Sequence, residues 1–405
     1  MALNNHTEGV DTIMHGLLRP EEVAPVRKPL AEATPLPPRI YTDPNVFAAE
    51  RERIFRREWL PAGVVDQVRE PGDYFTVDIA GQPLVILRDE CGDINTFYRV
   101  CRHRSALIVK GKGNAKTFQC PYHRWTYDLK GRLISAPDMQ KTTAFRKEDI
   151  RLVGVRTEIW QGVIMINFDS EAPPLAPRLA ALDPRLAPWN IVDLEVEVER
   201  RFECAFDWKL MFENAVEPYH VQGTHFDSSE HVMPSAGCWV ELEHDGAPYS
   251  VYHHPFATPL PADTPRGGPR ATESGVTLEG LPASVHEEIV FISVWPCLLI
   301  SLSHIGIISY IVQPQGPASC SFTWRVHLHP SAKHQPGFKE SMRLTADRIE
   351  LVQSEDEGVC PEVAKGLASW GSKPSYFSHL EGCIWCFQRW YADRMTLEDS
   401  FDNSK

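Results

Sequence analysis

The chain has 405 residues and a formal net charge of -13, a length typical of two or three domains. The acidic balance excludes nucleic acid as the main partner, because binding phosphates requires a basic face. No apolar run is long enough to span a bilayer, and the N-terminus lacks the basic start and apolar middle of a secretory signal. We therefore expect a cytoplasmic protein without a membrane partner, whose ten cysteines stay reduced and are free to bind metal.

An arm and a helix are predicted at the beginning of the chain. Proline and charged residues dominate residues 18–40, a composition typical of an extended segment. Asp43 then offers a helix cap, and Pro44 fits the first turn that follows it. Phe47 and Phe55 fall on one side of the predicted helix, which would bury that side.

A domain of short strands is predicted from Trp59 to Phe168. The β-rich stretches are "DYFTVDIAG", "QPLVILRDECGDI", "AKTFQC", "TYDLKGRL" and "GVIMINFD". Turns containing glycine separate several of them, as expected for antiparallel strands joined by hairpins.

Two pairs of metal-binding residues lie on loops of this β-domain. Cys101 and His103 form a Cys-x-His pair, and Cys120 and His123 form a Cys-x-x-His pair. Structural zinc sites use the same four ligands, but zinc fingers group both cysteines in one pair and both histidines in the other. A Rieske-type [2Fe–2S] cluster has two cysteines on one iron and two histidines on the other, so mixed pairs favour the cluster.

The run "CRHRSALIVKGKGNAKTFQCPYHRWTYDLKGRL" resembles the Rieske loops of ring-hydroxylating and related Rieske non-haem iron oxygenases. The resemblance implies one [2Fe–2S] cluster per chain, bound by Cys101, His103, Cys120 and His123. A Rieske domain alone would only carry electrons, so the function depends on the remaining chain.

Residues 169–405 are predicted to form a second, α+β domain. A proline-rich stretch, "DSEAPPLAPRLAALDPRLAPWN", marks its beginning. Strands are predicted in "VEVERRFECAF", "EEIVFISVWPCLLISLS", "GIISYIVQPQ" and "SCSFTWRVHLHP", and helices from about Pro336 onward. Strands followed by helices indicate an antiparallel sheet packed against helices.

The stretch "DWKLMFENAVEPYHVQGTH" is predicted to begin as a helix and to break near Gly223. It contains His220 and His225, which would ordinarily be surface histidines, but polar groups among aromatic residues require a reason. Non-haem iron(II) that activates O₂ is bound by two histidines and one carboxylate. The stretch is similar to the corresponding oxygenase segment at Trp208, Lys209, Glu213, Asn214, Glu217, His220 and His225.

That resemblance implies the roles of the site residues. His220 and His225 would bind one mononuclear Fe(II) per chain, with Asn214 nearby, and Glu217 would hydrogen-bond both an iron-ligand histidine and a Rieske histidine of the neighbouring subunit. Many ring dioxygenases have aspartate where this chain has Glu217. The third iron ligand is expected in "QSEDEGVCPEVAKGL" at Asp356, with the adjacent Glu355 and Glu357 as alternatives.

The resemblance covers residues 41–395 and implies a terminal oxygenase. Its fold would be an N-terminal arm and helix (1–58) packed on the catalytic domain, an all-β Rieske domain (59–168), and a helix-grip, or START-like, catalytic domain (169–405). Electrons from NAD(P)H would arrive through a separate reductase, with or without a ferredoxin, because no nucleotide-binding fingerprint occurs here. The two metals of one chain would be too far apart for electron transfer, so the resemblance implies a homotrimer.

The substrate is the least determined feature. Glu217 and the acidic helix resemble the branch that hydroxylates or demethylates small quaternary ammonium compounds, and Trp239, Tyr249, Tyr252 and Trp295 are candidates for an aromatic cage. The alternatives are mono- or dihydroxylation of an aromatic acid or other aromatic compound and, remotely, a Rieske electron carrier without enzymatic activity.

Two further residue pairs are not assigned to a metal site. His253 and His254 are expected on a loop, and Cys383 and Cys386 are expected in the core.

Overall fold

The computed structural model describes residues 13–242, 246–258, 278 and 280–396, so the first twelve residues of the chain lie outside the described part. The chain divides into two compact units. One unit is Phe55–Ala176, and the other joins the described residues up to Ile54 to those from Pro177 onward.

The first unit consists of antiparallel strands, as expected. Its larger sheet contains, in spatial order, β1 (Leu60–Val64), β10 (Val163–Asn167), β9 (Gly154–Trp160), β4 (Ile94–Tyr98), β3 (Gln82–Arg88), β2 (Asp73–Ile79) and β5 (Lys112–Asn114). Its smaller sheet contains β6 (Thr117–Gln119), β7 (Thr126–Asp128) and β8 (Leu133–Ser135). Between these strands lies a core that includes Phe97, Phe118 and Tyr127 and extends to Cys101 and Cys120. The two cysteine loops are therefore anchored in the packed interior.

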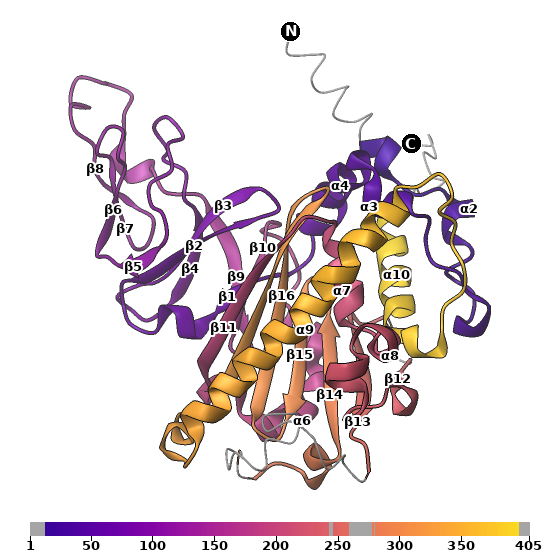
Figure 1. The fold of residues 1–405 in the computed structure, drawn as a ribbon. Helices are drawn as coiled ribbons and strands as arrows, with labels where there is room; N and C mark the ends of the chain where they lie inside the picture. Colours follow the sequence, from indigo (N-terminus) through magenta and orange to yellow (C-terminus); the bar gives the residue numbers. More distant parts are fainter. Residues whose placement is uncertain (1–12, 243–245, 259–277, 279, 397–405) are drawn as a thin grey trace. The chain divides into compact units, whose positions relative to one another are not determined.

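The second unit contains a seven-stranded antiparallel sheet with helices on it (Figure 1). In spatial order the strands are β11 (Glu195–Cys204), β17 (Ser319–Leu328), β16 (Gly306–Gly316), β15 (Leu298–Ser303), β14 (Glu288–Val294), β13 (Tyr249–Pro255) and β12 (Trp239–Glu241). The longer helices are α7 (Trp208–Ala215), α9 (Phe338–Leu367) and α10 (Gly382–Met395), and the shorter helices are α2 (Pro20–Val23), α3 (Arg39–Thr42), α4 (Pro44–Glu50), α5 (Ala176–Leu179), α6 (Asp183–Leu186) and α8 (Val221–Thr224). The strands predicted in "EEIVFISVWPCLLISLS" are confirmed as β14 and β15, which pair across the turn at Trp295–Cys297.

Helix α9 crosses this sheet (Figure 1). Met342, Ala346 and Ile349 lie on one side of the helix and pack against Val326 and Leu328 of β17. Apolar residues spaced by three and four form one stripe of a helix, which explains why this side is buried. The same spacing continues toward Asp356, so packing of the helix on the sheet determines which acid faces inward.

The N-terminal helix is held on this unit by buried charges. The predicted cap is present, since the Asp43 side chain accepts a hydrogen bond from the amide of Asn45. At the end of α4, the Glu50 carboxylate lies 2.5 Å from the Lys209 ammonium, and both side chains are fully buried. Asp207 lies 2.8 Å from the same ammonium, so two carboxylates share this one buried cation.

Two expected local structures were wrong. The segment with the histidines leaves the helical conformation after Ala215, before Pro218, rather than at Gly223, because proline disfavours helical geometry in the residue that precedes it. His253 and His254 lie on the buried strand β13 rather than on a loop. Carboxylates and a carbonyl satisfy these two rings, which is how a strand accommodates polar side chains in the interior.

Candidate active site

The two cysteine loops of the first unit have the same backbone turn despite their different spacing. The carbonyl of Cys101 accepts from the amide of Ser105, and the carbonyl of Cys120 accepts from the amide of Arg124 in the same way. Ser105 and Arg124 both adopt left-handed backbone angles, with φ of 55° and 58°. The loops therefore present their cysteines in equivalent ways, although the histidine follows at the second position in one and at the third in the other.

The four side chains of these loops lie together. Both cysteines are buried, and the rings of His103 and His123 have centroids 4.6 Å apart. The Cys101 sulfur lies 3.3 Å from the Tyr127 hydroxyl, and burial raises the pKa of the Cys120 thiol. The His103 ring stacks on Trp125, which shields one side of the site.

This arrangement fits a two-iron cluster. The Nδ1 atom of His123 is buried and has no hydrogen-bond partner among the described residues, as expected for a ring nitrogen that binds metal. Among the described residues, no three of these four side chains have ligand atoms within 4.8 Å of one another. A single tetrahedral zinc ion would require all four to be that close. Two cysteines on one iron and two histidines on another satisfy both observations.

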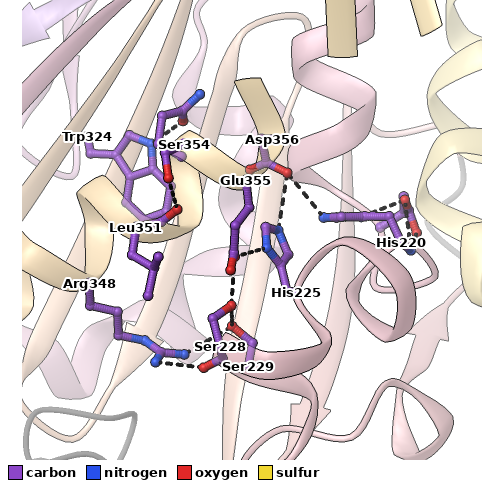
Figure 2. Close-up of polar contacts among 12 residues, drawn as sticks. His220, His225, Ser228, Ser229, Trp324, Arg348, Leu351, Ser354, Glu355 and Asp356 are labelled. Atoms are coloured by element: carbon purple, nitrogen blue, oxygen red, sulfur yellow. Dashed lines mark hydrogen bonds and ion pairs between the residues drawn. The ribbon is translucent and has the colours of Figure 1, made fainter. Parts of the chain in front are cut away.

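The second unit brings His220, His225 and Asp356 together. One ligand atom from each lies within 4.8 Å of the others. His220 and His225 flank the short helix α8, whereas Asp356 projects from α9 about 130 residues later (Figure 2). The Asp356 Oδ1 atom lies 3.1 Å from His225 Nε2 and 3.7 Å from His220 Nε2, but its geometry makes no hydrogen bond. A buried carboxylate oxygen that faces two imidazole nitrogens without bonding to them fits a bound cation.

Carboxylates orient both imidazole rings of this cluster. Glu217 Oε1 lies 2.7 Å from His220 Nδ1, and Glu355 Oε2 lies 2.6 Å from His225 Nδ1. With Nδ1 of each ring bonded to a carboxylate, Nε2 is directed at the centre of the cluster. Burial lowers the pKa of His225, but the adjacent carboxylates of Asp356 and Glu355 outweigh it and raise the pKa above its usual value.

Glu217 reaches His220 through a turn and not along a continuous helix, because α7 has already ended. Its carboxylate also accepts hydrogen bonds from the amides of Tyr219 and His220. The second oxygen, which we expected to be free for a neighbouring subunit, is therefore already bonded within the chain. A carboxylate has about four lone-pair positions, so these bonds leave room for another donor.

The structure also separates the three adjacent acids. Asp356 points at the two Nε2 atoms, and Glu355 bonds the outer nitrogen of His225 and the Ser228 hydroxyl (Figure 2). Glu357 is exposed. The positioning role of Glu355 was missed. Its partners lie about 130 residues earlier in the chain, and a run of three acids contains no signal that distinguishes a ligand from a residue that orients one.

A cavity of about 210 Å³ opens at this cluster. Alternate residues of five strands line it: Tyr252, His254, Ile289, Phe291, Leu299, Ser301, Ile308, Tyr310, Phe322 and Trp324. Thr345, Arg348, Ile349 and Val352 line it from α9, on the same side of the helix as Asp356. Asn214 also lines the cavity, and its buried Oδ1 has no hydrogen-bond partner among the described residues.

The aromatic cage expected from the sequence was mostly wrong. Only Tyr252 of the four candidates lines the cavity. Tyr249 is an odd number of residues from Tyr252 along β13, so its side chain points to the opposite side of the sheet. Trp295 lies in the turn after β14 and packs near Trp390, whereas Trp239 stacks on His253 and is half-exposed. Phe291, Tyr310, Phe322 and Trp324 provide the aromatic walls instead.

Comparisons with known families match both units. The family described as "Ring hydroxylating alpha subunit (catalytic domain)" matches residues 191–397, and the family described as "Rieske [2Fe-2S] domain" matches residues 58–146.

None of the helices in the described part of the chain is both long enough and apolar enough to cross a bilayer.

The chain is similar to several named proteins. It is 37% identical to the glycine betaine monooxygenase oxygenase subunit of Chromohalobacter salexigens over 47% of this chain, although the aligned region spans only 43% of that relative. It is 26% identical to the chloroplastic choline monooxygenase of Arabidopsis thaliana over 84% of this chain and 78% of that protein. A solved quaternary ammonium Rieske monooxygenase, described in relation to carnitine oxidation, superimposes with a TM-score of 0.79 at 22% identity over 94% of this chain and 100% of that structure, which shows a shared fold.

Proposed function

The chain belongs to the family of ring-hydroxylating alpha subunits, and from this membership we propose that it is a terminal oxygenase that oxidatively demethylates a small quaternary ammonium compound. The observation that carries the proposal is the cluster of His220, His225 and Asp356 at the end of a cavity with aromatic walls. A Rieske electron carrier would require neither the cluster nor the cavity.

The proposed metal ligands are Cys101 and Cys120 for one iron of the Rieske cluster, His103 and His123 for the other, and His220, His225 and Asp356 for mononuclear Fe(II). When bound, the Rieske cluster supplies electrons, and Fe(II) with two histidines and one carboxylate activates O₂ at its open positions. Glu217 and Glu355 bond the Nδ1 atoms of His220 and His225, which leaves Nε2 of each ring for the metal.

The walls of the cavity fit a quaternary ammonium group. Tyr252, Phe291, Tyr310 and Trp324 present aromatic rings, which attract a cation that cannot donate hydrogen bonds. His254 is neutral at physiological pH, because burial lowers its pKa to about 4, so it does not repel such a cation. The carboxylates of Glu217, Glu355 and Asp356 make the metal end of the cavity favourable for positive charge.

The proposed overall reaction converts R–N(CH₃)₃⁺, O₂, NAD(P)H and H⁺ to R–NH(CH₃)₂⁺, formaldehyde, water and NAD(P)⁺. One oxygen atom enters the methyl group that leaves as formaldehyde, and the other is reduced to water. The test is a coupled assay with a reductase, in which glycine betaine, carnitine, choline and benzoate are compared for O₂ uptake and formaldehyde. One formaldehyde per NAD(P)H with an N-methyl compound supports the proposal, and a hydroxylated benzoate without formaldehyde contradicts it.

We further propose that the enzyme is a cytoplasmic homotrimer, in which each Rieske unit passes electrons to the catalytic unit of a neighbour through Glu217. The support is the Glu217–His220 hydrogen bond, which places the carboxylate one bond from a metal ligand. If almost no trimer is present at the concentration used in the activity assay and the enzyme is still active, this assembly is contradicted.

The partner that delivers electrons is proposed to be acidic. Six basic residues around the Rieske loops are all exposed: Arg102, Arg104, Lys110, Lys112, Lys116 and Arg124. Such a patch steers an acidic partner, and salt screens the attraction, since the Debye length falls to about 8 Å at physiological ionic strength. We expect turnover to fall with rising salt and charge reversal at Lys112 and Lys116 to lower the reductase-dependent rate. A rate that is insensitive to salt would contradict the patch.

A further inference from the structure

The cavity contains a positive charge at a distance from the metal ligands. Arg348 projects from α9 and lines the same cavity as Asp356. Asp356 follows it by eight residues along the helix. Eight residues correspond to about 12 Å along the helix axis, so the two residues start from separate positions along the cavity wall. Figure 2 shows Arg348 beside Ser228 and Ser229, away from His220.

The guanidinium of Arg348 is held by neutral groups. One terminal nitrogen donates to the Ser228 carbonyl and the other donates to the Ser229 hydroxyl, both at 3.1 Å. Over the described residues, no carboxylate oxygen lies within 4.0 Å of this guanidinium. Because a guanidinium has five N–H donors, these two bonds orient the group and leave donors for a ligand.

Two buried cations of this unit have carboxylates in direct contact, whereas Arg348 does not. Lys209 has Glu50 at 2.5 Å, and Arg325 has Glu199 at 2.6 Å. Burial lowers the pKa of Arg348, with Glu355 and Tyr310 opposing the shift, but arginine remains charged at physiological pH. A largely shielded guanidinium that has no carboxylate in direct contact is stabilised by an anion that binds to its remaining N–H donors.

We propose that Arg348 binds the carboxylate of a zwitterionic substrate, a betaine, whose quaternary ammonium end faces the metal ligands. This inference rests on the proposed demethylase function and narrows its substrate class. The aromatic walls at Tyr310 and Trp324 hold the ammonium end, and a guanidinium matches the two oxygens of a carboxylate. A purely cationic N-methyl compound such as choline gains nothing from Arg348 and is repelled by it.

The test measures equilibrium binding by calorimetry to the intact holoprotein without O₂, so that turnover plays no part. The ligands are glycine betaine and carnitine, each compared with its methyl ester, together with choline. In the unmodified protein, each betaine is expected to bind about 10- to 100-fold more tightly than its ester, the range for one hydrogen-bonded charge pair. Esters that bind as tightly as the acids overturn the inference, and this comparison requires no variant.

Substitution then identifies the residue. Arg348→Gln is expected to remove that preference and to leave choline binding unchanged or tighter, because a like charge is lost. Arg343→Gln is the matched control, since Arg343 lies on the same helix but is exposed and pairs with Glu340. Equal weakening of choline and betaines by Arg348→Gln would indicate a structural defect and overturn the inference.

The outcomes separate this inference from the function beneath it. Choline binding as tight as betaine binding, with formaldehyde formed from choline, overturns the role of Arg348 and leaves the demethylase standing. Failure of every N-methyl compound to bind or to yield formaldehyde overturns the proposed function, and the inference with it.

Discussion

Single alanine substitutions at Glu355, Asp356 and Glu357 should have three different effects on iron binding. These residues are consecutive, and each step along a helix rotates the side chain by about 100°. Asp356 faces the two Nε2 atoms, Glu355 orients His225 from outside the cluster, and Glu357 points to solvent. One helix turn therefore contains a proposed ligand, a proposed positioning residue and a control.

The expected magnitudes follow from these contacts. Asp356→Ala removes a ligand and its charge, and iron affinity should fall by more than about 100-fold, beyond the usual effect of residues outside the ligand set. Glu355→Ala removes the 2.6 Å bond to His225 Nδ1 and should weaken iron binding by about 10- to 100-fold, or roughly 1.4–2.7 kcal/mol. Glu357→Ala should leave iron affinity unchanged.

The assay is anaerobic titration of Fe(II) against a competing chelator, with total iron measured in parallel. The unmodified protein should contain about three irons per chain, of which two belong to the Rieske cluster. The Rieske absorption spectrum is the internal control and should be the same in all three variants. Loss of iron from Glu357→Ala, or equal losses from Glu355→Ala and Asp356→Ala, would refute the assignment.

Three further perturbations address the remaining parts of the site. Glu217→Gln should leave both metal centres filled but nearly abolish oxidation of the reduced Rieske cluster in a single turnover; oxidation at the unmodified rate would exclude Glu217 as the bridge. Lys209→Met leaves Glu50 and Asp207 buried without their cation and should destabilise the protein by about 3–5 kcal/mol in urea unfolding, with partial recovery on adding Glu50→Gln. Burial lowers the folded-state pKa of His254 to about 4, below the unfolded value of about 6.5, so its contribution to stability is complete above pH 6.5 and is lost as pH falls toward 4. We expect His254→Asn to reduce the loss of unfolding free energy over this interval by up to about 3 kcal/mol, and an unchanged pH profile would contradict the neutral, buried state of the ring.

Local spacing determined what could be predicted about the metal-binding loops. The pairs Cys101–His103 and Cys120–His123 each lie within one turn, and the ligand types alone limit the chemistry of each pair. The same holds for His220 and Glu217, since residues three apart remain neighbours whether the backbone forms a helix or, as here, a turn at Pro218. The β-rich composition of "EEIVFISVWPCLLISLS" likewise predicted strands where β14 and β15 lie, because this signal is local.

The tertiary structure decided which distant residues meet. Selection of Asp356 from three acids, the bond from Glu355 to His225 and the position of Arg348 all depend on how α9 is rotated where it packs on the sheet. The aromatic walls come from separate strands, and their inward direction depends on strand register, so Trp295 and Tyr249 could not be excluded from the chain alone. Sequence pattern specifies geometry over a few residues, whereas contacts between residues a hundred positions apart arise only when the packed elements fix one another's rotation and register.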